Sequence, residues 1–144
     1  MVVYADSSFL VSLLVDDSNS LPARNYLVRN PEPVSFTRFS KLEAQHAIRA
    51  LVFQKDIALD EMTRALLQFE HDEAEGFFRS LTLDYDAIFE KASQLSHRHA
   101  LESGVRYLDM LHIASALLAN ATRFLTFDKR QGKLAKAVGL QVKP

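Results

Sequence analysis

The chain has 144 residues, of which 48% are hydrophobic and 24% are charged, and its formal net charge is −1. This length and composition suit one domain with a substantial buried core, so we expect a single domain over residues 1–144 and exclude a disordered chain. The sequence has no cysteine, which excludes disulfides, thiolate catalysis, zinc–thiolate sites and iron–sulfur clusters and fits a reducing cytoplasm.

In chain order, the first half of the sequence predicts short strands separated by helices. Residues 2–5 (VVYA) are typical of a buried strand, and apolar residues from Phe9 onward predict a helix that starts near Ser8. Asp6 interrupts this apolar stretch and no basic region precedes it, so we expect neither a signal peptide nor a membrane span. A helix over residues 18–29, a strand over 34–36 and a helix over 39–54 follow.

The second half continues the alternation. Asp60 is predicted to cap a helix that extends to about residue 77, before a strand over residues 81–83. Helices over 86–100 and 107–119, a strand over 123–127, a helix over 129–137 and a strand over 140–142 complete the pattern. Alternating strands and helices predict a parallel sheet covered on both faces, a three-layer α/β/α fold. Such sheets bind ligands beyond the carboxyl ends of their strands.

Two aspartates follow directly on predicted strands, where this fold class places its ligand site. Asp6 follows the strand over residues 2–5, Asp128 follows the strand over 123–127, and each precedes a helix. Each also has an alternative structural role. Asp6 can cap the helix near Ser8, and Asp128 with Gln131 matches a capping box. Taken singly, the capping role is favoured for both residues.

Two further acids occur in predicted helices. Asp109 lies in the first turn of an apolar helix, where the helix dipole stabilises a carboxylate. A buried carboxylate also needs a partner, and a metal ion is one of the few good partners. Glu43 lies at the border of an apolar helix face predicted to include Leu42 and Ile48. By itself, Glu43 is typical of a solvated helix surface.

The four acids together indicate a cation site. Three of them occur at junctions expected to converge in an α/β sheet, and the fourth lies on a crossover helix. Clustered carboxylates raise one another's pKa unless a cation offsets their charge. Oxygen ligands and the absence of cysteine favour Mg²⁺ or Mn²⁺ over zinc. Such ions orient a phosphate, generate a hydroxide and neutralise charge in phosphoryl chemistry.

Four motifs resemble those of the PIN domain family, in the family's order and over nearly the whole chain. The first is YADSSFL at residues 4–10, where a strand ends in Asp6, and the second is TRFSKLE at 37–43, which ends in Glu43. The third is LDMLHIASA at 108–116, which contains Asp109, and the fourth is FLTFDK at 124–129, which contains Asp128. GLQV at 139–142 resembles the closing strand. The chain length and the lack of appended domains are most similar to the VapC toxins of toxin–antitoxin pairs.

This resemblance implies a five-stranded parallel sheet, a homodimer and an endoribonuclease that requires Mg²⁺ or Mn²⁺. It also implies inhibition by a cognate antitoxin, whose C-terminal segment lies across the groove beside the site. By motif, Asp6 and Asp109 would be the principal metal ligands. Glu43 and Asp128 would complete the acidic cluster, directly or through water.

The resemblance extends to hydroxyl residues and also shows one departure. It implies that the hydroxyls of Ser8 and Thr126 orient Asp6 and Asp128, respectively. Many relatives have a further acid just after the fourth motif, where this chain has KR at residues 129–130. The departure leaves the number of metal ions open between one and two.

Basic residues are concentrated near the C-terminal end of the chain. From residue 123 onward there are six basic residues and one acid, whereas residues 56–90 contain ten acids and two basic residues. The predicted contacts to RNA phosphates are Lys129, Arg130, Lys133 and Arg38. The alternative is a set of solvated surface side chains, because lysine and arginine are mostly exposed in any protein.

Other features leave alternatives open. His112 is a candidate general base, but helix packing is favoured because a metal-bound water needs no histidine. The stripe of Met62, Leu66 and Phe69 is either core or, by resemblance, part of the antitoxin groove. An inert PIN-like module that binds RNA or a partner is the main functional alternative, and a phosphatase or DNA nuclease is a third. Degenerate PIN domains typically lack acids, and none is missing here.

Overall fold

The computed structural model describes residues 1–144 and contains one five-stranded, fully parallel sheet. The strands are β1 (Val2–Ala5), β2 (Val34–Thr37), β3 (Phe78–Leu81), β4 (Ala121–Leu125) and β5 (Gln141–Lys143). Their order in the sheet is β3-β2-β1-β4-β5, so the first strand is central. The chain adds β2 and β3 on one side of β1 and then crosses back to add β4 and β5 on the other side. Parallel strands require crossover connections, which the helices supply.

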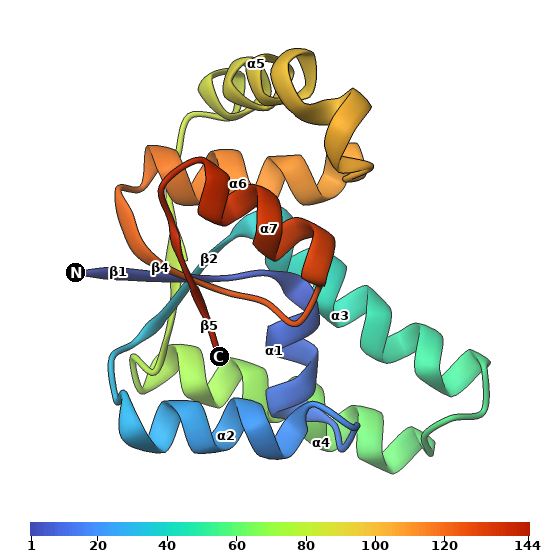
Figure 1. Ribbon diagram of the computed structural model, residues 1–144. Helices are drawn as coiled ribbons and strands as arrows, with labels where there is room; N and C mark the ends of the chain where they lie inside the picture. The colour runs from blue at the N-terminus through green and yellow to red at the C-terminus, as the bar shows by residue number, and fades with distance from the viewer.

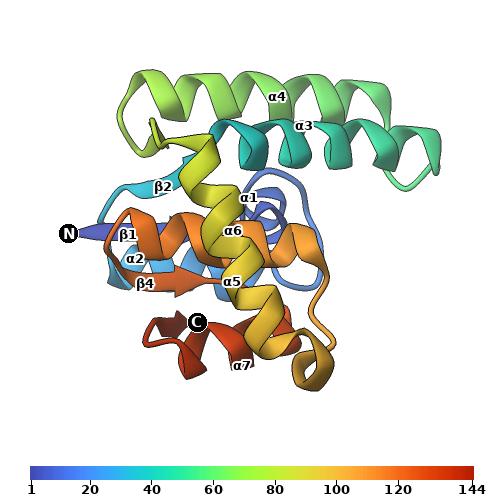
Figure 2. The same cartoon turned by 90° about the horizontal axis from the view of Figure 1, so that it is seen from above.

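Seven helices cover both faces of this sheet. They are α1 (Ser7–Leu14), α2 (Ser20–Arg29), α3 (Arg38–Phe53), α4 (Leu59–Ala74), α5 (Tyr85–Ser103), α6 (Tyr107–Leu118) and α7 (Lys129–Ala137). Figure 1 shows α5, α6 and α7 on one side of the strands and α1, α2 and α4 on the other. In Figure 2, α3 and α4 lie side by side along one edge of the molecule. The predicted three-layer α/β/α fold with five parallel strands is confirmed.

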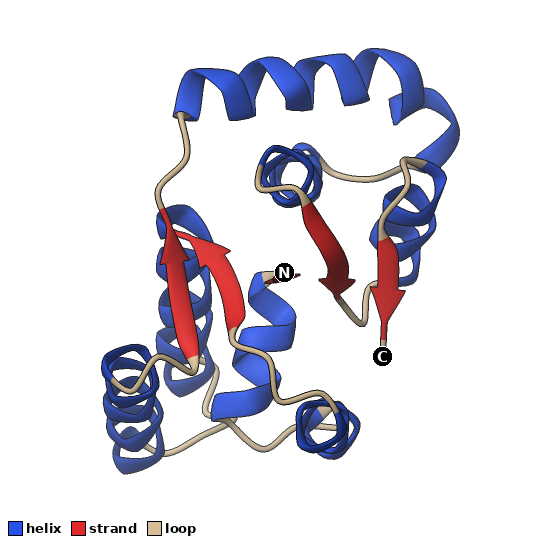
Figure 3. Cartoon of the chain, turned by 90° about the vertical axis from the view of Figure 1, so that its left-hand side faces the viewer, coloured by secondary structure: helices blue, strands red, loops and turns tan.

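Side-chain alternation along the central strand divides the core in two. Tyr4 points toward α5, α6 and α7 and stacks on Phe124 of β4 with 5.8 Å between ring centroids. Its neighbours Val3 and Ala5 point the other way, into a cluster formed by α1, α2, α3 and α4. Both faces of β1 are therefore buried, which explains its continuous apolar sequence. In Figure 3 the strands stand between the two groups of helices.

Several predicted boundaries differ from the structure. Strand β4 ends at Leu125, two residues earlier than predicted, so Asp128 follows it after a short loop and not directly. Helix α4 begins at Leu59 with Ala58 as its N-cap, so Asp60 lies in the first turn and is not the cap. Strand β3 lies three residues earlier than predicted, because Phe78 anchors it by packing edge-to-face against Phe36 and Phe69. Arg79 and Ser80 are exposed on this edge strand, so its sequence lacks the apolar run that predicts a buried strand. The structure contains no helix long and apolar enough to cross a lipid bilayer.

Candidate active site at the carboxyl ends of the strands

Asp6 lies at the carboxyl end of the central strand and is only 4% exposed. Its Oδ1 accepts hydrogen bonds from the backbone N–H of Phe9 (2.8 Å) and the hydroxyl of Ser8 (2.9 Å), and its Oδ2 accepts one from Thr126 (2.6 Å). The bond from Phe9 makes Asp6 the N-cap of α1, so the capping role predicted from the sequence is real. Burial raises the pKa of Asp6, and no lysine or arginine pairs with it. Its charge therefore has hydrogen bonds but no counter-ion.

Thr126 and Gln131 connect Asp6 to the other two aspartates of the site. The Thr126 hydroxyl lies 3.0 Å from Gln131 Oε1 and accepts a hydrogen bond of 3.0 Å from the backbone N–H of Asp128. Gln131, which is fully buried, donates from Nε2 to the carbonyl of Asp109 (3.2 Å). One hydroxyl and one amide thus fix the loop after β4 against the ends of β1 and α6.

The predicted capping box at Asp128 is only half formed. Asp128 Oδ1 accepts from the backbone N–H of Gln131 (2.9 Å) and caps α7. The Gln131 side chain does not return to the Asp128 N–H, because it bonds Thr126 and Asp109 instead. The Thr126 hydroxyl was expected to orient the Asp128 carboxylate, but it donates to Asp6 and reaches Asp128 only at the backbone.

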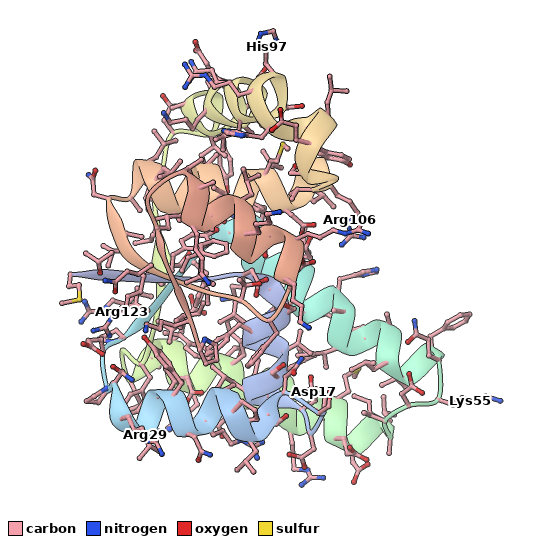
Figure 4. All side chains as sticks on the ribbon, viewed as in Figure 1. Asp17, Arg29, Lys55, His97, Arg106 and Arg123 are labelled. Carbon is pink, nitrogen blue, oxygen red and sulfur yellow. The ribbon has the colours of Figure 1, made fainter.

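Asp109, in the first turn of α6, has a side chain that is 18% exposed. Burial raises its pKa, and the negative charge of Asp128 adds to this effect, although the nearby Arg106 guanidinium opposes it. Arg106 Nε lies 3.4 Å from Asp109 Oδ2, a contact that the sequence analysis missed. Figure 4 shows Arg106 on the side of the molecule where α1 and α7 begin, opposite to Arg123.

Glu43 extends from α3 toward the same end of the sheet. Its Oε1 accepts hydrogen bonds from the Ser7 hydroxyl and from His112 Nε2, the latter at 3.0 Å. The bond from His112 is the main reason that the pKa of Glu43 is lowered, so this carboxylate is held as an anion. Leu42, which was predicted to face the core, is 64% exposed, whereas Ala44 is fully buried. Glu43 is half-buried at the edge of that buried face.

Three of the four carboxylates share one arrangement of their oxygens. In each, one oxygen is held by the protein and the other accepts no hydrogen bond from it, and these free oxygens are Glu43 Oε2, Asp109 Oδ1 and Asp128 Oδ2. No three histidine or acidic side chains are arranged as a complete metal-binding group. An all-oxygen donor set with free carboxylate oxygens fits Mg²⁺, which keeps several waters and takes only one or two carboxylates from the protein.

The predicted RNA-binding residues lie on the two helices that also carry or directly follow acids of the site, α7 after Asp128 and α3 with Glu43. Lys129, Arg130 and Lys133 are exposed on α7 and form no ion pair. Arg130 and Lys133 line a cavity of about 270 Å³ between α5 and α7. Arg38 lines a second cavity, of about 760 Å³, beside the start of α3. The predicted basic residues therefore pair with none of the four acids.

A comparison with models of protein families identifies the family of this chain. The model of the PIN domain family matches residues 3–137, a span that contains all four acids. The chain belongs to the PIN domain family. No curated protein sequence matches this PIN domain.

Solved structures share the fold of this PIN domain at low sequence identity. Mycobacterium tuberculosis VapC20, described as a toxin that cleaves the sarcin–ricin loop, superposes with a TM-score of 0.72 at 16% identity, with 99% of each chain covered. Rickettsia felis VapBC2, bound to a DNA fragment from its promoter, gives a TM-score of 0.66 at 12% identity, with 99% of this chain and 98% of that chain covered. Neisseria gonorrhoeae FitAcB gives 0.64 at 15% identity, with 99% and 96% covered.

Proposed function

We propose that this PIN domain is a divalent-metal-dependent endoribonuclease and the toxin of a VapBC-type toxin–antitoxin pair. The observation that carries the proposal is the buried carboxylate of Asp6, which lies without a counter-ion at the carboxyl end of the central strand. Asp6 is 4% exposed without a counter-ion, and the charge of Asp128 raises the pKa of Asp109. A buried carboxylate without a counter-ion lowers stability unless a cation pairs with it, so Asp6 favours a cation at this position.

The proposed ligands of Mg²⁺, or of Mn²⁺ in its place, are Asp6 and Asp109, with Glu43 and Asp128 contributing directly or through water. A carboxylate has about four lone-pair positions, and Asp6 uses three of them for hydrogen bonds, which leaves one at Oδ2. Ser8 holds Asp6 in this orientation. When bound, the metal would orient the scissile phosphate and lower the pKa of an attacking water.

The basic residues beside the acids would hold the RNA strand. Arg130 and Lys133, which line the cavity between α5 and α7, and Lys129 beside them would contact phosphates on one side of the cleaved bond. Arg38, at the start of α3, would contact phosphates on the other side. All four cations have no ion-pair partner, so binding RNA would break no existing salt bridge.

Exposed apolar side chains support the proposed protein partners. On α3 and α4, Leu42 and Leu67 are 64% and 61% exposed, a surface suited to an antitoxin segment lying along these helices. On α5 and α6, Phe89 and Tyr107 are 58% and 74% exposed, a surface suited to a homodimer. Phe69 is fully buried and Met62 and Leu66 pack on the core, so that stripe is structural. A small DNA-binding protein encoded next to this gene is the expected antitoxin.

The test is cleavage of single-stranded RNA by Asp6→Asn, with Asp16→Asn as a matched control. Asp16 is an exposed aspartate whose side chain pairs with Arg24 on the surface. We expect the wild type and the control to cleave RNA when Mg²⁺ is added, and Asp6→Asn to be inactive although folded. Cleavage by Asp6→Asn at the wild-type rate would disprove the site. RNA binding without cleavage by the wild type would favour the inert module, and equal cleavage of DNA of the same sequence would favour a DNA nuclease.

A further inference from the structure

His112 is buried beside the acidic cluster, where β1, α3 and α6 meet. Its side chain is 1% exposed, and its two ring nitrogens contact different groups. Nε2 lies 3.0 Å from Glu43 Oε1. Nδ1 lies 3.2 Å from the Ser40 hydroxyl and 3.4 Å from the Tyr4 hydroxyl. Phe39 packs on the ring with 5.2 Å between centroids.

These contacts determine which ring nitrogen carries a proton. A carboxylate oxygen only accepts hydrogen bonds, so Nε2 must be the donor to Glu43. Hydroxyl groups can donate or accept, so Ser40 and Tyr4 satisfy Nδ1 in either state. The hydroxyls of Thr37, Ser40 and Tyr4 also bond one another, at 2.8 Å and 2.9 Å. Nε2 therefore carries a proton, and the ring has hydrogen-bond partners at both ends.

The same contacts argue against a general base. A general base needs a nitrogen within reach of the water or hydroxyl that it deprotonates. Both nitrogens of His112 already have partners inside the protein, and the ring is closed off from solvent. They also argue for more than packing, because an apolar residue would fill the space without contacting Glu43. The hydrogen bond to Glu43 Oε1 leaves Oε2 without a hydrogen-bond donor from the protein.

We propose that His112 is a positioning residue, which anchors Glu43 Oε1 so that Oε2 remains available to a divalent cation or its bound water. This inference rests on the proposed function of the acidic cluster. Ser7 donates to the same oxygen from the first residue of α1, directly after Asp6. Two helices thus restrict the rotamer of Glu43 before any ligand binds. Partners that orient a metal ligand in this way commonly change metal affinity or activity by about 10–100-fold when they are replaced.

The test uses substitutions that replace one ring nitrogen of His112 at a time. In His112→Gln the carboxamide takes the place of Nε2 and can still donate to Glu43. In His112→Asn it takes the place of Nδ1, reaches Ser40 but not Glu43, and serves as the matched control. His112→Leu retains apolar volume and no donor. Mn²⁺ affinity of the full chain is measured by calorimetry without RNA, and thermal unfolding in EDTA reports folding.

We expect His112→Gln to bind Mn²⁺ within about threefold of the wild type, and His112→Asn and His112→Leu to bind it about 10–100-fold more weakly. In RNA cleavage the two weak variants should lose kcat with little change in KM for RNA. Wild-type Mn²⁺ affinity in a folded His112→Leu would overturn the inference. Nitrogen-15 spectra of the wild type provide a measurement that needs no variant. Nε2–H in these spectra supports the assignment, and an unprotonated Nε2 overturns it.

Glu43→Gln and Asp6→Asn distinguish this inference from the function on which it rests. If both weaken Mn²⁺ binding and His112→Leu does not, the role of His112 is refuted and the metal site stands. If neither weakens Mn²⁺ binding, the metal site is misplaced, and the inference about His112 falls with it.

Discussion

Replacing Asp6 by asparagine should stabilise the metal-free protein while it abolishes activity. Asp6 Oδ2 accepts from the Thr126 hydroxyl, which has a single proton and lies 3.0 Å from a second acceptor, Gln131 Oε1. An asparagine amide can donate to the Thr126 oxygen, and the hydroxyl proton can then go to Gln131. The variant therefore keeps a hydrogen bond to Thr126 at this position.

The expected size of the effect follows from two opposed contributions. Making three hydrogen bonds neutral instead of charge-assisted costs roughly 1 kcal/mol each, or about 3 kcal/mol in all. Removing a buried, unpaired charge also removes its desolvation penalty, which is several kcal/mol of folding free energy. Burial raises the pKa of Asp6 despite its hydrogen bonds, which indicates that the second contribution is larger. We expect a net stabilisation of about 1–2 kcal/mol at neutral pH, a range typical of substitutions that relieve a strained site.

The assay is thermal unfolding in EDTA between pH 4 and 8, with Asp16→Asn as the control. A carboxyl whose pKa is raised on folding binds its proton more tightly in the native state. Its contribution to stability is therefore present below the ordinary aspartate pKa of about 4 and is lost as the pH rises through the raised value. The Tm of Asp6→Asn should exceed that of the wild type by roughly 3–6 °C at neutral pH and converge with it in acid. With Mn²⁺ the order should reverse, because only the wild type gains binding energy. A lower Tm for Asp6→Asn in EDTA at pH 7.5 would refute the reasoning.

Two further predictions concern the surroundings of Asp6 and the RNA path. Thr126→Val removes the hydroxyl that donates to Asp6 and should lower the free energy of unfolding by about 1–3 kcal/mol. Thr126→Ser keeps a hydroxyl and should retain most of the wild-type stability. Urea unfolding measures both variants, and an unchanged midpoint for the valine variant would contradict the role of Thr126 in holding Asp6. Arg130→Ala with Lys133→Ala should weaken RNA binding and reduce the slope of log affinity against log salt by about 1.4, at about 0.7 for each lost phosphate contact on a single strand. Lys136→Ala, on the same helix but outside the cavity, is the control, and an equal effect there would show that only net charge matters.

The sequence predicted the order of the elements and the placement of the acids because these depend on local patterns. A buried strand that ends in an aspartate and continues into a helix can be read from adjacent residues, as at Asp6. The predictions failed where packing decides. On α3, Leu42 lies on the opposite side of the helix from Ala44, because two residues correspond to just over half a turn. Polar Ser40 takes part in the buried face instead, as part of the hydroxyl cluster around His112.

The sequence by itself determined that this chain is a parallel α/β domain with acids at the ends of its strands, because strand periodicity and helix capping are local properties. Only the tertiary structure decided how those acids are held. Thr126 reaches Asp6 across 120 residues, and His112 reaches Glu43 across 69, and no spacing in the sequence encodes such contacts. These hydrogen bonds exist because the sheet order brings β4 beside β1, and packing brings α6 against α3. Thr126 and Gln131 link the three aspartates, and Ser7 and His112 hold Glu43, through contacts that only the folded chain brings together.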